Sequence, residues 1–161
     1  MQAGFLPEKI DLLHIWVDAD ACPKAIKAIL YRASQRLEVE LTLVANASLH
    51  IPRSPWIKNI VVKKGADVAD QEIVSRLSTG DLVITADIPL AAEVIGKGGH
   101  ALNPRGTLYN KDNVQQSLAM RNFLDNLRGS GVITGGPPVF GKGDCMAFAN
   151  ALDRFLTRYV H

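Results

Sequence analysis

The sequence predicts an α/β fold, a three-layer α/β/α sandwich built on a mainly parallel sheet. Two observations lead to this prediction. Short apolar runs typical of buried strands alternate with longer segments in which apolar residues recur at helical spacing. The predicted order is strand and helix, strand, strand and helix, strand and helix, then strand, and such alternation favours parallel strands joined by crossover helices.

Composition and length indicate a soluble protein with one domain. The chain has 161 residues, of which we assign 14–161 to a single α/β domain and 1–13 to an N-terminal arm. No apolar run reaches the length of about 18 residues that a membrane span needs, so we expect no membrane association. Two cysteines without zinc-type spacing and an N-terminus without a signal-peptide pattern indicate the cytoplasm. The net charge of +2 permits a polyanionic partner without requiring one.

The first half of the chain contains three predicted strands. Residues 14–17 form the first, and Pro23 then suits the first position of a helix that continues to Leu37. Residues 39–45 are rich in β-branched side chains and predict the second strand. A loop with two prolines separates this strand from the third, over residues 57–63.

The next helix and strand follow the same scheme. Asp67 is a plausible N-cap, with Asp70 in the first turn of a helix that Gly80 ends. Residues 82–85 are the most apolar strand, and Asp87 follows it directly. A helix then runs to Ile95, and a short strand is expected at residues 100–102.

The C-terminal third predicts two helices separated by a long loop. The first helix is capped by Asp112 or Asn113 and stopped by Gly129, with apolar Val114, Leu118, Phe123, Leu124 and Leu127 on one face. The second helix begins at Asp144 and is expected to bury Met146, Phe148, Ala149, Leu152, Phe155, Leu156 and Tyr159. The glycine- and proline-rich segment between them is too long for a simple connector, which indicates a functional or mobile loop.

Four aspartates, Asp18, Asp20, Asp70 and Asp87, lie at junctions that a parallel sheet brings to one edge. Clustered carboxylates repel one another unless a cation neutralises them, and hard oxygen ligands favour Mg²⁺ or Mn²⁺. We therefore predict that all four act as metal ligands and catalytic residues, with Asp20 as an extra ligand or water-orienting base. The alternative is that each acid only caps a helix; Asp18 is harder to explain this way, because it ends a strand before any helix begins.

Other side chains are assigned to the same edge. Thr85 is expected to contact a metal ligand without binding the metal itself. Lys64, Arg105 and Lys142 fall in junctions or loops where they could contact an RNA backbone, although ordinary solvated charge explains them equally well. Cys22 could be an activated thiol, but we favour a small buried side chain, because neighbouring carboxylates raise a thiol pKa.

Several motifs together resemble the YaiI/YqxD family of uncharacterised bacterial proteins. They are Val17-Asp-Ala-Asp-Ala-Cys-Pro23, Asp67-Val-Ala-Asp70, Asp81-Leu-Val-Ile-Thr-Ala-Asp-Ile-Pro-Leu-Ala91, Lys97-Gly98, Leu102-Asn-Pro-Arg-Gly106 and the segment from Gly136-Pro137 to Asp144. The resemblance extends from about residue 14 to the C-terminus. The resemblance implies a bacterial protein, but it implies no activity, because the family has none that is established.

The chain is more remotely similar to PIN-like (PilT N-terminal) nucleases. Their pattern is an Asp ending the first strand, an acid opening a mid-chain helix, and Thr-x-Asp after the next buried strand, matched here by Asp18, Asp70 and Thr85-Ala86-Asp87. The similarity implies a PIN-like sheet and Mg²⁺- or Mn²⁺-dependent hydrolysis of RNA. The continuation Asp20-Ala21-Cys22-Pro23 departs from the PIN pattern, and no fourth PIN acid is visible after Gly106.

Two alternative functions stay open at this point. One is a non-catalytic RNA- or protein-binding module with the same fold. The other is a phosphatase similar to the haloacid dehalogenases, with Asp18 as nucleophile, Asp20 as general acid, and Thr85 and Lys97 in supporting roles. The later acid pair of that family has no counterpart at a strand end in this sequence.

Overall fold

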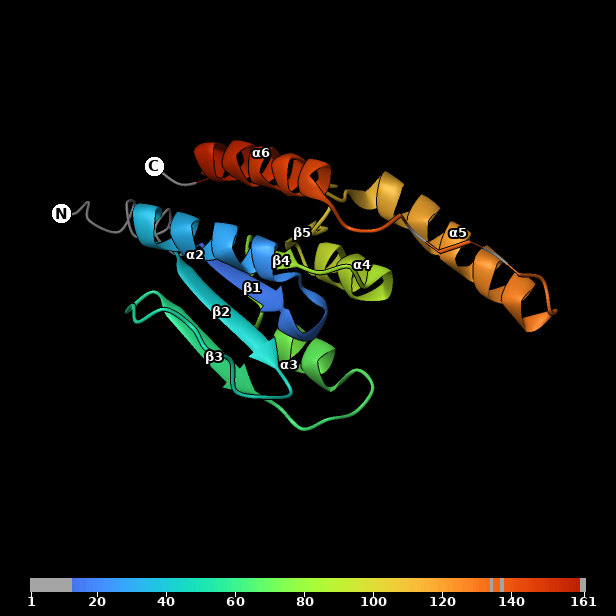
Figure 1. The fold of residues 1–161 in the computed structure, drawn as a ribbon, viewed down its shortest axis with the longest axis horizontal. Helices are drawn as coiled ribbons and strands as arrows, with labels where there is room; N and C mark the ends of the chain where they lie inside the picture. Colours follow the sequence, from blue (N-terminus) through green and yellow to red (C-terminus); the bar gives the residue numbers. More distant parts are fainter. Residues whose placement is uncertain (1–12, 134, 137, 160–161) are drawn as a thin grey trace.

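The computed structural model describes residues 13–133, 135–136 and 138–159. Its strands form one five-stranded sheet in the order β3-β2-β1-β4-β5 (Figure 1). The strands are β1 (His14–Asp18), β2 (Glu40–Ala45), β3 (Ile57–Val61), β4 (Leu82–Ile84) and β5 (His100–Leu102). Every pairing between them is parallel, which confirms the predicted sheet.

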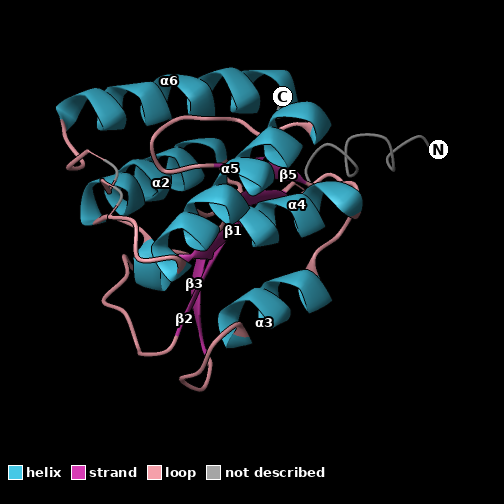
Figure 2. Cartoon of the chain, turned by 90° about the vertical axis from the view of Figure 1, so that its right-hand side faces the viewer, coloured by secondary structure: helices cyan, strands magenta, loops and turns pink. Residues whose placement is uncertain are grey.

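Helices cover both faces of the sheet. They are α2 (Lys24–Leu37), α3 (Val68–Arg76), α4 (Ile88–Gly96), α5 (Lys111–Gly129) and α6 (Lys142–Tyr159), with a short 3₁₀ turn, η1 (Ala19–Ala21), after β1. Helices α2 and α6 lie on one side, and α3 and α4 on the other (Figure 2). This arrangement confirms the three-layer α/β/α fold.

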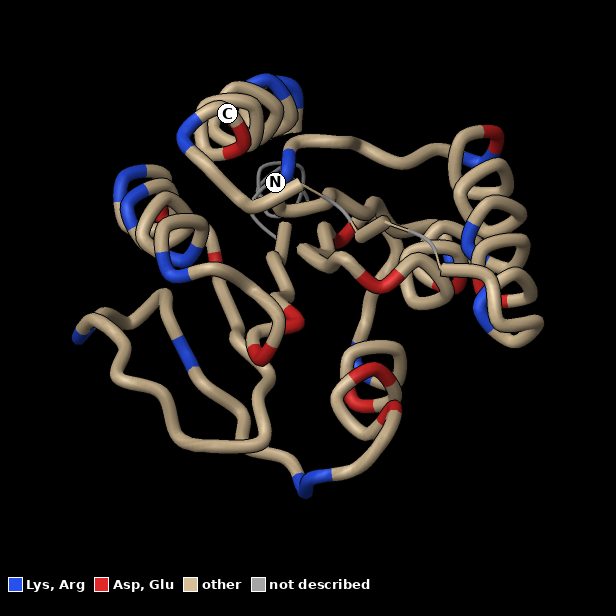
Figure 3. Tube along the Cα trace, turned by 45° about the vertical axis from the view of Figure 1, so that its right-hand side comes forward, with Lys and Arg blue, Asp and Glu red and all other residues tan. Residues whose placement is uncertain are grey.

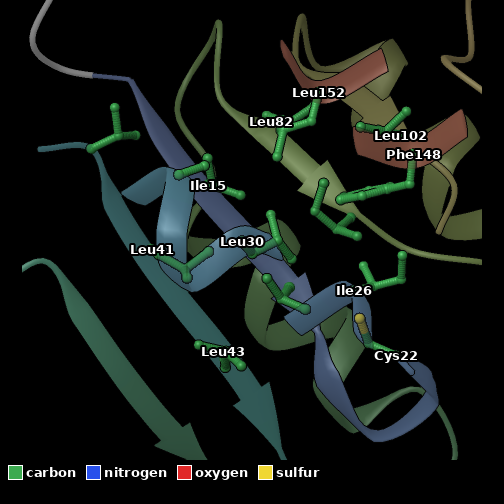
Figure 4. Close-up of a cluster of buried hydrophobic side chains, with 14 of the residues drawn as sticks. Ile15, Cys22, Ile26, Leu30, Leu41, Leu43, Leu82, Leu102, Phe148 and Leu152 are labelled. Atoms are coloured by element: carbon green, nitrogen blue, oxygen red, sulfur yellow. The ribbon is translucent and has the colours of Figure 1, made fainter. Parts of the chain in front are cut away.

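The period of two along the strands divides the core into two clusters. Ile15 and Leu43 lie in one cluster with Ile26 of α2 and Phe148 of α6 (Figure 4). Val17 belongs to the same cluster. On the opposite face, the alternate strand residues pack against α3 and α4. The strand residues of this cluster are Trp16, Val44, Val83 and Ala101, and the helix residues include Ile73, Leu90 and Val94. Alternate residues of a strand point to opposite faces, so both faces of a covered parallel sheet are apolar.

The largest difference from prediction concerns α5. Its apolar residues were expected to mark a packed face, but only Val114 is buried and Phe123 is 55% exposed. The reason is that α5 extends beyond the edge of the sheet after its first turns (Figure 1). Met146 of α6 was also expected to be buried but is 67% exposed.

Helix ends differ from prediction by a few residues. Helix α2 begins directly after Pro23, which stands at the N-cap, and α3 ends at Arg76, before Gly80. The Asp67 side chain accepts no capping hydrogen bond, and Asp67 adopts a left-handed conformation with φ +65°. Helix α5 is capped by Asn110 through a reciprocal bond with Asn113, and α6 begins at Lys142.

The predicted arm of residues 1–13 lies outside the described residues except for Leu13. Leu13 is buried and joins the α2 side of the core. Across the part of the chain that is described, no helix is both long enough and apolar enough to cross a membrane.

Candidate active site

The sheet order places two strand ends at a switch point. From β1 the sheet continues through β2 and β3 on one side and through β4 and β5 on the other. In open parallel sheets, ligands bind beyond the carboxyl ends of the strands where the order reverses. Asp18 ends β1, and Thr85 and Asp87 follow β4, so the predicted residues lie at this point.

A chain of hydrogen bonds joins the two strand ends. The Thr85 hydroxyl donates to Asp18 Oδ2 at 3.0 Å and accepts from the Asp87 backbone N–H at 2.9 Å. Thr85 is buried, with 1% of its surface exposed, so its rotamer is restrained by packing. The predicted supporting role of Thr85 therefore has a structural basis: this side chain holds the Asp18 carboxylate in place.

Asp87 performs two tasks. Its Oδ1 accepts the Leu90 backbone N–H at 3.0 Å and so caps α4. Its side chain is also hydrogen-bonded to that of Asp70, which comes from the first turn of α3. Capping alone, the simpler interpretation of Asp87, explains only the first of these contacts.

Burial and the neighbouring acids raise the pKa of Asp70 and of Asp18. Burial, followed by the charges of Asp87 and Asp18 and the hydrogen bond to Asp87, raises the pKa of Asp70 to about 7. Burial also raises the pKa of Asp18, and the charges of Asp87 and Asp20 add to this, although the Thr85 hydrogen bond acts in the opposite direction. Asp18, Asp70 and Asp87 therefore form one interacting group.

Asp20 is at the margin of this group. Its carboxylate is exposed and accepts the Asn46 backbone N–H, at 3.0 Å to Oδ2 and 3.3 Å to Oδ1. This contact joins η1 to the segment that follows β2. Sequence reasoning missed Asn46, because a backbone donor leaves no signal in the residue type.

Among the described residues, no three His, Cys, Asp or Glu side chains are arranged to hold a metal ion together. The donor chemistry nevertheless fits Mg²⁺ or Mn²⁺, because the group consists of carboxylate oxygens that lie close enough to raise the pKa of Asp70. Mg²⁺ is commonly held by only one or two carboxylates and keeps several waters. Asp70 and Asp87, with Asp18 beside them, would be its ligands.

The three predicted RNA-contacting side chains have different surroundings. Lys64 and Lys142 are exposed. Arg105 instead holds the segment before α6: it donates to Asp144 Oδ2 at 3.0 Å and to the Pro138 carbonyl at 2.6 Å, and it lies 5.5 Å from the centre of the Phe140 ring. With its guanidinium engaged in this way, Arg105 acts as a structural tether in this conformation.

Two other side chains considered from the sequence are not equipped for chemistry here. Burial raises the pKa of the Cys22 thiol to about 12, so the thiol stays protonated, in agreement with a packing role. Lys97 follows the last turn of α4, whereas Asp87 precedes its first turn. A nine-residue helix is about 13 Å long, so Lys97 lies at the end of α4 that is away from Asp87 and does not have the position that the phosphatase interpretation gives it.

The sequence of this chain matches the family model described as "Uncharacterized BCR, YaiI/YqxD family" over residues 16–158. The chain belongs to the YaiI/YqxD family. The similarity includes β1 from Trp16 onwards, every helix that contributes to the acidic group, and nearly all of α6. The expected family resemblance is therefore confirmed, whereas the similarity to PIN-like nucleases stays a hypothesis.

Curated relatives of similar length carry the name UPF0178 protein. One from Aromatoleum aromaticum is 63% identical over 148 residues, covering 92% of this chain and 99% of the relative. Another, from Janthinobacterium sp. strain Marseille, is 62% identical over 146 residues, with coverages of 91% and 97%. A third, from Syntrophotalea carbinolica, is 60% identical over 148 residues, covering 92% and 100%. No solved structure gives a significant match.

Proposed function

We propose that this member of the YaiI/YqxD family is a cytoplasmic, Mg²⁺- or Mn²⁺-dependent nuclease that hydrolyses RNA phosphodiesters. The observation that supports it most is the pair Asp70 and Asp87, two acids at the N-terminal ends of separate helices, whose proximity at the switch point of the sheet adds to burial in raising the pKa of Asp70. Such a pair is costly for folding unless a cation or a proton neutralises it. Perturbed acids in this position are typical of functional sites.

The proposed roles follow from the contacts. Asp70 and Asp87 would hold the ion directly, Asp18 would lie beside them, and Thr85 would orient Asp18 through its hydroxyl. Asp20, which is exposed beside them, would orient the attacking water. When bound, the ion would supply activation of water and stabilisation of the leaving oxygen. Lys64 and Lys142 would contact the RNA backbone.

A cleavage assay tests the proposal. Purified protein is incubated with a fluorescent single-stranded RNA and Mn²⁺, with and without chelator, beside Asp87→Asn. Asparagine caps helices about as well as aspartate, so this variant should keep α4 intact. Glu93→Gln, an exposed change at the other end of α4, is the matched control.

Cleavage that needs metal, persists in Glu93→Gln and is lost in Asp87→Asn is the expected result. Equal cleavage by Asp87→Asn would contradict the assigned site and indicate a contaminant. The competing function, a non-catalytic RNA-binding module, predicts RNA binding by all three proteins and cleavage by none.

A further inference from the structure

Helix α2 is basic. It carries Lys24, Lys27, Arg32 and Arg36 and contains no Asp or Glu. At 100° per residue Lys24 and Arg32 are on the side opposite Ile26 and Leu30, which are buried in the core, whereas Lys27 and Arg36 lie at the two borders of the exposed face. None of the four forms an ion pair with another residue of the described part of the chain. Uncompensated charge along one helix face favours a polyanionic partner.

A groove opens beside the first half of this helix. It has a volume of about 380 Å³ and lies between α2 and the segment after β2, lined by Lys24, Lys27, Ala28, Tyr31, Leu49 and His50. The lining therefore combines two ammonium groups with two aromatic rings and an apolar floor. Aromatic rings on which bases stack, next to cations that track phosphates, are the common elements of single-strand binding surfaces.

The groove is next to the acidic group. Asn46, four residues before His50, donates its N–H to Asp20 at the edge of that group. Cys22 is near both regions, because both Lys27 and Asp18 are close enough to influence the pKa of its thiol. Figure 3 shows Asp and Glu positions at the junctions around the sheet edge and Lys and Arg positions along the neighbouring α2. An RNA strand in the groove would thus continue directly into the proposed catalytic site.

We propose that this groove binds one nucleotide of a single-stranded RNA. Lys24 and Lys27 contact the two phosphates on either side of it, and the base stacks against Tyr31 and His50. A single strand is the required form, because a base inside a duplex is stacked on its neighbours and cannot reach the rings. The inference deepens the proposed function and rests on it for the identity of the polymer.

The test is a binding measurement that needs no catalysis. Fluorescence anisotropy of a labelled ten-nucleotide oligouridylate is recorded with the full chain in EDTA, over a range of salt concentrations. The variant is Lys24→Gln/Lys27→Gln. The control is Lys58→Gln/Lys97→Gln, which removes the same number of charges at the opposite ends of the strands, near the starts of β3 and β5. A second variant, His50→Ala, alters an exposed ring.

The groove variant is expected to bind about tenfold more weakly than the control at low salt. Its plot of log affinity against log salt should be shallower by about 1.4, the value for two phosphate contacts on a single strand. His50→Ala should weaken binding without changing the salt slope, and a double-stranded RNA of equal length should compete poorly.

Three results would overturn the inference: no binding of the oligonucleotide by the wild-type chain, equal affinity of the groove and control variants, or equally strong competition by the duplex. Circular dichroism of each variant confirms that it is folded. Because the measurement contains no metal, failure of the nuclease proposal in the cleavage assay would not produce any of these results. The two hypotheses therefore fail separately.

Discussion

The side chains of Asp70 and Asp87 are hydrogen-bonded to each other, although both are acids and they come from the first turn of α3 and the N-cap of α4. Burial is the largest cause that raises the pKa of Asp70 from 3.8 to about 7, and the charges of Asp87 and Asp18 and the hydrogen bond to Asp87 add to it. We therefore expect the stability of the folded protein to depend on pH and on cations.

The Asp70 proton should stabilise the fold at low pH. The folded pKa is above the unfolded value, so the folded chain binds the proton more tightly, and its contribution is complete below 3.8 and lost as the pH rises through about 7. We expect Asp70→Asn, which keeps the hydrogen bond without the charge, to remove this dependence. Thermal melting from about pH 4 to pH 8 measures it. If the melting temperature changed with pH in the same way in the variant and the wild type, Asp70 would not be the source of the pH dependence.

Cations should replace that proton. Because Mn²⁺ and the proton compete for the same oxygens, the rise in melting temperature caused by Mn²⁺ should be larger at about pH 8 than at about pH 6. Asp70→Asn and Asp87→Asn should respond little at either pH, and Glu93→Gln should respond like the wild type. A shift of equal size in all four proteins would place the ion elsewhere.

Thr85 should be needed to position Asp18. Replacement by the isosteric valine removes the donor to Asp18 and the acceptor of the Asp87 N–H, and it leaves buried polar groups unpaired. We expect a loss of about 1–3 kcal/mol in the free energy of unfolding, measured with urea. Thr85→Ser, which keeps the hydroxyl, should recover most of it. If the valine variant were as stable as the wild type, the hydrogen bonds of the Thr85 hydroxyl would contribute nothing to the free energy of unfolding.

Gly106 should tolerate no side chain. A Cβ there would lie 2.7 Å from the Ala147 backbone carbon, and φ is +100°, so Gly106→Ala combines a collision with α6 and an unfavourable backbone conformation. We expect a loss of about 2–4 kcal/mol in urea unfolding. Gly80→Ala is the matched control, since φ is +93° but nothing lies within 4 Å. That variant should lose only about 1–2 kcal/mol, and an equal loss in both would exclude the collision as a cause.

Local patterns in the sequence were sufficient for the sheet and for the position of the acids. Apolar runs such as residues 82–84 are buried on both faces, and residues that follow parallel strands meet at one edge whatever the loops do. The helix ends were less predictable, because capping depends on backbone geometry. Asn110 caps α5, for example, although Asp112 and Asn113 are equally suitable residue types.

The tertiary structure alone decided which side chains meet. Trp16 donates to the buried Asp81 at 3.0 Å across 65 residues of sequence, and Arg105 is held by Asp144 across 39. The proximity of Asp70 to Asp87 and the groove beside α2 arise in the same way. Residue type determines which contacts are chemically possible, but a carboxylate can serve as a cap, a buried acceptor or a metal ligand. Its role depends on the distances and the burial that the folded chain imposes.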